Sequence, residues 1–164
     1  MDFGGLNATE VQAAAAALKI DPQKVTNNAD VEMQWAVKAY QHAETHFNLI
    51  SSVDPRAIRL TRIDDEIYTR FRQEFADFPV DELREEDLKS PEAKEKWRPF
   101  CSYFENKVED FNMGTLLRTD SRKEFSEENS MLVLRIQFLA VEIARNREGY
   151  NDGIRKLKDK VVAR

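Results

Sequence analysis

Apolar residues recur at helical spacing along most of the chain, and the densest run lies near its C-terminal end. The segment RIQFLAVEIARNREGYN, residues Arg135–Asn151, places apolar side chains on more than one side of a predicted helix that Gly149 ends. Such a helix is typical of the centre of a helical protein. One apolar stripe, which begins just before this segment, consists of Leu132, Ile136, Leu139 and Ile143.

The rest of the pattern also predicts helices. Only five Gly and five Pro interrupt the chain, and no segment shows the alternating, β-branched pattern of a strand framed by turns. Helices are predicted over residues 9–19 and 31–50, and Thr115–Arg118 is the only stretch that allows a short extended piece. The sequence therefore predicts an all-α fold, a compact single-domain helical bundle with a buried central C-terminal helix.

Capping residues indicate where these helices begin. Asp54 and Ser90 each precede a proline, which suits the first helical position because that position needs no N–H. By the same logic Asp30 caps the helix over residues 31–50, and Ser126 caps the central helix. A further helix over residues 92–111 is expected to kink or split at its internal proline.

Composition and charge narrow the class of protein. The chain has 164 residues, 41% of them hydrophobic, which is enough for one domain with a real core. Its net charge of −5 disfavours a general nucleic-acid or membrane-surface binder and favours a basic partner. The single cysteine, Cys101, and the absence of a signal-like N-terminus lead us to expect a cytoplasmic protein, with the nucleus as a second compartment.

Two groups of side chains raise the question of catalysis or metal binding. His42 and His46 are four residues apart, but the HExxH pattern is missing, so structural histidines are favoured over a metal site. Asp64, Asp65 and Glu66 could act as an acid and base or bind Mg²⁺, although they also suit a helix start after Thr61. With no phosphate-binding loop in the sequence, we expect a protein that is not an enzyme and needs no metal or cofactor.

The polar end of the central segment supports two readings. It can form a salt-bridged helix end, because Arg145 lies three residues beyond Glu142. It can equally form a partner surface, because Arg and Tyr are favoured at interfaces.

The C-terminal tail of the chain is basic: residues 152–164 carry +3, which leaves −8 for residues 1–151. That tail is either a solvated helix end or a docking arm for ribosomal RNA or an acidic partner.

Several motifs together resemble one eukaryotic family, the polysaccharide-biosynthesis-domain-containing protein family. The two most specific are VEDFNMGTLLR from Val108 and RIQFLAVEIARNREGYN from Arg135. The others are DVEMQWAVKAYQHAE from Asp30, LISSVDP from Leu49, TRIDDEIY from Thr61 and AKEKWRPFC from Ala93. The resemblance divides the chain into a variable segment with one Ala-rich helix (1–29), the family's helical domain (30–151) and a basic C-terminal tail (152–164).

The resemblance implies an ATP-independent chaperone dedicated to newly made translation elongation factor 1-alpha. Such a protein would work at the ribosome with the nascent polypeptide-associated complex and protect the GTP-binding domain of its client. A stable adaptor subunit and a polysaccharide-biosynthesis protein are the alternatives, and no sugar-nucleotide motif supports the latter. The predicted partner-binding residues are Arg145, Asn146, Arg147, Glu148 and Tyr150, with Trp97, Arg98, Asp110 and Asn112.

Overall fold

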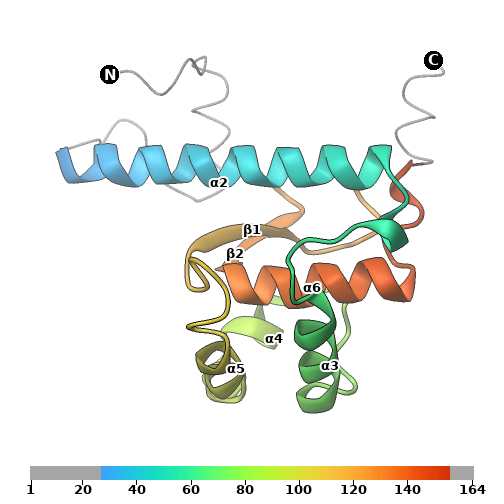
Figure 1. Ribbon diagram of the computed structural model, residues 1–164. Coiled ribbons are helices and arrows are strands. Elements are labelled where there is room, and N and C mark those ends of the chain that lie inside the picture. Colours follow the sequence, from blue (N-terminus) through green and yellow to red (C-terminus); the bar gives the residue numbers. More distant parts are fainter. Residues whose placement is uncertain (1–26, 156–164) are drawn as a thin grey trace, which may run out of the picture.

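The protein places a small β-hairpin between helices. The computed structural model describes residues 27–155, so the helix predicted over residues 9–19 lies outside the described residues (Figure 1). The described part is mostly helical. Its elements, in chain order, are α2 (Asn27–Ser52), a 3-10 turn η2 (Pro55–Ala57), α3 (Asp64–Glu74), α4 (Glu85–Lys89), α5 (Pro91–Tyr103), β1 (Gly114–Arg118), β2 (Ser130–Leu134) and α6 (Arg135–Glu148).

The hairpin is covered on both faces. Successive side chains of a strand point to opposite faces, so each strand contributes to two layers. Leu116 and Leu132 pack with Ala39 and Ala43 of α2, while Leu117 and Val133 join the main core with α3, α5 and α6. Figure 1 shows this order, with α2 along one side of the hairpin and α6 along the other. The predicted central helix, α6, is indeed buried along almost its whole length.

The all-α prediction was wrong at this hairpin. Strand β1 covers the extended piece that the sequence allows at Thr115–Arg118, and its antiparallel partner β2 occupies a stretch that the sequence places in part in the central helix. Leu132 therefore lies in a strand, and α6 begins only at Arg135. Met and Leu are good helix formers, so local preference favoured a helix here, but pairing with β1 and burial between two helical layers outweigh it.

The helix boundaries confirm some capping predictions and correct others. The side chain of Asp54 accepts a hydrogen bond from Arg56 N at 3.1 Å, and that of Ser90 accepts one from Ala93 N at 3.1 Å. Ser126 does not cap α6, because its hydroxyl accepts from Asn129 N in the turn before β2. Gly149 ends α6 in the left-handed conformation, with φ of 90°.

Two helices differ in length from the prediction. Helix α2 begins at Asn27, so Asp30 lies inside it and does not cap it. Helix α5 contains Pro99 without a split but stops at Tyr103, well before residue 111. The main aromatic cluster then joins α3 to α5: Trp97 stacks on Phe75 with ring centroids 4.2 Å apart, and Phe71 and Phe100 surround them. These rings fix the position of α5.

Gly114 allows α2 to approach the hairpin closely. A Cβ atom at this position would lie 2.0 Å from a ring carbon of Trp35 on α2. We predict that Gly114→Ala destabilises the fold by about 1–3 kcal/mol through overpacking. Thermal unfolding followed by circular dichroism measures the effect. Gly153→Ala is the matched control, because a Cβ there meets no atom within 4 Å; equal unfolding temperatures for the two variants would contradict the prediction.

Candidate binding groove

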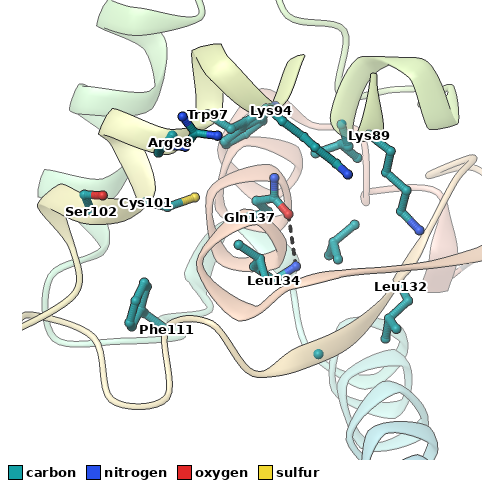
Figure 2. Close-up of a pocket in the computed structure, with 13 residues that line it drawn as sticks. Lys89, Lys94, Trp97, Arg98, Cys101, Ser102, Phe111, Leu132, Leu134 and Gln137 are labelled. Carbon is teal, nitrogen blue, oxygen red and sulfur yellow. Dashed lines mark hydrogen bonds between the residues drawn. The ribbon is translucent and has the colours of Figure 1, made fainter. Parts of the chain in front are cut away.

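An open groove runs between the α4–α5 segment and strand β2 (Figure 2). Its volume is about 550 Å³, which lies in the range of ligand-binding pockets. Helices α4 and α5 form one wall, and β2 with the start of α6 forms the other. The lining side chains used below are Lys89, Lys94, Trp97, Arg98, Cys101, Phe111, Leu132, Val133, Leu134 and Gln137.

The floor of the groove is apolar and firmly held. Trp97 is only 2% exposed, and its indole N–H donates to the carbonyl of Asp87 at 3.2 Å, which ties α5 to α4. Burial raises the pKa of the Cys101 thiol to about 11, so the thiol is neutral and adds to the apolar surface. Phe111 borders the groove from the turn before β1. The groove thus offers preformed apolar surface at little ordering cost.

The rim of the groove is cationic. Lys94 and Arg98 are four residues apart on α5, one turn of a helix, so their side chains leave the same face. Lys89, at the end of α4, adds a third cation, and Figure 2 shows the three side chains around the opening. Within residues 27–155, no carboxylate side chain lines the groove. The rim of the groove is therefore positively charged, although the chain as a whole has a net charge of −5.

The second wall is the outer edge of β2. Val133 packs into the main core on one face of the hairpin, whereas Leu132 packs toward α2 on the other, yet both line the groove together with Leu134. Residues from both faces of one strand share a cavity only where the cavity follows the edge of that strand. Gln137 closes one end of the edge, because its side-chain oxygen accepts from Leu134 N at 3.0 Å (Figure 2).

Four of the predicted binding residues lie in or next to this groove. Arg98 is exposed on its rim, and Trp97 forms its floor, so only part of the indole faces the opening. Asp110 and Asn112 are exposed in the turn on either side of Phe111. Asp110 adopts a positive φ of 54°, which shapes this turn. Sequence reasoning missed Lys89, Lys94 and the edge of β2; the spacing of Lys94, Arg98 and Cys101 was the one available signal.

The other predicted binding residues, Arg145, Asn146, Arg147, Glu148 and Tyr150, lie away from the groove at the end of α6, and two of them are internal. Arg145 and Asn146 are 0% and 2% exposed, so the structure does not place them on a partner surface. Arg147 is exposed and donates to Asp65 at 2.6 Å, and Tyr150 is 41% exposed. Glu148 accepts hydrogen bonds from Tyr68 and Arg72, at 2.9 and 2.8 Å. The salt-bridged reading of this helix end therefore describes its geometry better than the surface reading.

A buried polar cluster explains why Arg145 is internal. Its guanidinium donates to Glu142 at 2.6 Å, to the carbonyl of Val80 at 2.6 Å and to that of Thr119 at 3.2 Å. The other oxygen of Glu142 accepts from Asn151 at 3.1 Å and lies 3.5 Å from Arg118. Arg118 in turn donates to Asn151 at 2.6 Å. We call this set, Arg118, Glu142, Arg145 and Asn151, the arginine–glutamate cluster.

The cluster sets the protonation of its neighbours. Burial alone would raise the pKa of Glu142, but Arg118 and Arg145 outweigh it and lower that pKa to about 2. His46 reaches the cluster from α2, with Nε2 3.5 Å from Glu142. Burial lowers the pKa of His46 to about 4; Glu142 opposes this shift and Arg118 adds to it. At neutral pH one carboxylate therefore faces two guanidinium groups and a neutral imidazole.

The histidine and carboxylate candidates have structural surroundings. His42 and His46 both pack edge-on against Phe138, at 5.1 and 4.9 Å between ring centroids. Asp64 is buried and accepts from the backbone N–H groups of Leu60 and Thr61, both at 2.7 Å. Within residues 27–155, no group of three or more His, Cys, Asp or Glu side chains could hold a metal ion. In the same range, no helix is long and apolar enough to span a bilayer.

Known proteins share both the sequence and the architecture. The family described as PBDC1 protein matches residues 31–156. Protein PBDC1 of Mus musculus is 54% identical over 88% of this chain and 73% of its own length, and that of Homo sapiens is 52% identical over 88% and 62%. The chain belongs to the PBDC1 family. A solution NMR structure of a Saccharomyces cerevisiae protein, 44% identical over 84% of this chain and 97% of its own, superposes with a TM-score of 0.73.

We predict that the arginine–glutamate cluster dominates the stability of this PBDC1-family domain. Glu142→Gln keeps the shape but leaves two buried guanidinium groups uncompensated, and it should cost about 3–5 kcal/mol. Chemical denaturation measures this loss. Asp65→Asn is the matched control, because its pair with Arg147 is exposed and should contribute no more than about 1 kcal/mol. A similar loss in both variants would refute the assignment.

The low pKa of His46 predicts acid sensitivity. The folded protein disfavours the imidazolium, so the unfolded chain binds the proton more tightly and stability falls as pH drops from the ordinary pKa of 6.5 to about 4. The loss from this group is on the order of 3 kcal/mol. The variant His46→Gln should flatten the stability curve across this window. The control His42→Gln should flatten the stability curve less, since burial lowers the pKa of the half-buried His42 to a smaller extent. Equal stability curves for the two variants would contradict the prediction.

Proposed function

We propose that this protein is an ATP-independent chaperone that binds newly synthesised translation elongation factor 1-alpha at the ribosome. In this proposal it acts by binding and not by catalysis, and it works together with the nascent polypeptide-associated complex. The observation that carries the proposal is the open apolar groove with a free strand edge, in a chain that resembles a family of dedicated chaperones. Such a groove suits a polypeptide that has not yet buried its own apolar residues.

The charge of the protein supports the same function. A net charge of −5 would attract a basic client domain and speed the encounter, while the local cationic rim selects what enters the groove. Holding requires no nucleotide. The client would leave once its own fold outcompetes the groove, because binding to a partly folded form shifts that equilibrium by mass action.

Selective ribosome profiling of the tagged full chain tests this function. We expect enrichment of ribosomes that translate elongation factor 1-alpha, starting once part of its GTP-binding domain has left the ribosome. Absence of enrichment on any nascent chain would overturn the proposal. Stoichiometric co-purification with a mature partner, without nascent chains, would instead support the adaptor reading.

A further inference from the structure

We propose that the outer edge of β2 receives an extended segment of the client as an added strand, with apolar side chains in the groove and carboxylates on its rim. This inference deepens the proposed function, on which it rests for the identity of the client. It concerns how the segment is recognised.

The register of the hairpin shows which backbone groups point outward. Arg135 N donates to Met113 O at 2.8 Å, and Thr119 N donates to Asn129 O at 3.1 Å. Both pairs fit the register in which Leu116 faces Leu132. In an antiparallel pair hydrogen-bonded and non-hydrogen-bonded positions alternate, so Leu132 is a non-hydrogen-bonded position. Its N–H and C=O therefore point away from β1, along the wall of the groove.

These outward groups are available to a ligand. No hydrogen bond of the described residues uses the backbone N–H or C=O of Leu132, and Ser130, two residues earlier, has the same orientation. At the other end Gln137 already occupies Leu134 N. An edge strand with unpaired groups beside a preformed apolar cavity is the arrangement used in strand addition to peptides. The free stretch is short, which limits the added strand to a few residues.

The chemistry of the groove defines the segment. Its floor accepts apolar side chains, its rim carries Lys89, Lys94 and Arg98, and none of the described residues that line it is a carboxylate. In a strand, alternate side chains point to one side, so apolar residues can enter the groove while the intervening acidic residues reach the rim. The fitting ligand is thus an extended segment in which apolar and acidic residues alternate. A nascent chain offers such segments before its own sheet forms.

Synthetic peptides test the ligand class directly. An eight-residue peptide with alternating Val and Glu should bind the full chain, and its counterpart with Lys in place of Glu should bind at least about tenfold more weakly, because it meets like charge on the rim. Isothermal titration calorimetry measures both. Equal affinities, or no binding of the acidic peptide, would overturn the inference.

N-methylated peptides test the strand geometry without altering the protein. Only alternate amides of an added strand face β2, so N-methyl groups on one set of alternating amides should abolish binding. N-methyl groups on the other set should leave most of it. Equal effects from the two sets would rule out strand addition. The amide resonance of Leu132 should shift on addition of the unmethylated peptide, and an unchanged resonance would contradict the assigned edge.

Charge reversal on α5 links the groove to the client. Lys94→Glu, on the rim, should weaken the acidic peptide about fivefold to tenfold and reduce co-purification of nascent client. Lys96→Glu is the control on the same helix, because Lys96 is exposed and does not line the groove. Its ammonium group lies over the ring of Phe75 instead. Similar losses in both variants would overturn the inference.

The two proposals fail in different ways. If Lys94→Glu loses the peptide but keeps its enrichment on nascent elongation factor 1-alpha, the groove is not the client site, while the chaperone function stands. If the peptide binds as expected but the wild-type protein accompanies no nascent chain, the chaperone function falls. In that case the strand-addition geometry stands and its occupant is another acidic polypeptide.

Discussion

The buried contact between Glu142 and two arginines holds the rest of the structure in place. Arg118 connects Glu142 to β1, and Arg145 connects it to the chain at Val80 and Thr119, while the neutral His46 of α2 packs 3.5 Å from Glu142. A buried carboxylate is tolerable only when such partners offset its loss of hydration, so these segments have one mutual arrangement. The hairpin is thereby fixed on α6, and so is the edge of β2 that forms one wall of the groove.

The sequence predicted the helix ends that depend only on residues close to one another along the chain. Proline after a capping side chain marked the starts at Pro55 and Pro91, and Gly149 marked the end of α6. It failed where distant segments decide. The run Ser130–Leu134 is a strand only because Gly114–Arg118 pairs with it, and two-stranded pairing leaves a weak local signal.

In the candidate site, too, the sequence predicted local contacts but not those made by distant segments. The contact of Arg145 with Glu142 followed from a spacing of three residues, but its burial depends on Arg118 and Asn151, which no local pattern reveals. Trp97 and Arg98 were singled out, yet their role as floor and rim requires β2 opposite them. The groove is thus a tertiary feature: its cations come from two helices and its open edge from a strand. An acidic protein with one basic, apolar groove can attract a basic domain and still select an acidic segment of it.

Site-specific photocrosslinking in ribosome–nascent-chain complexes tests the central claim most directly. A photoreactive residue at Arg98, on the rim, is compared with one at Lys38, exposed on α2 away from the groove. The account predicts crosslinks from position 98 to nascent elongation factor 1-alpha, lost when an alternating Val–Glu peptide is added in excess, and few from position 38. Equal crosslinking from both positions, or crosslinks unaffected by the peptide, would contradict the groove as the client site.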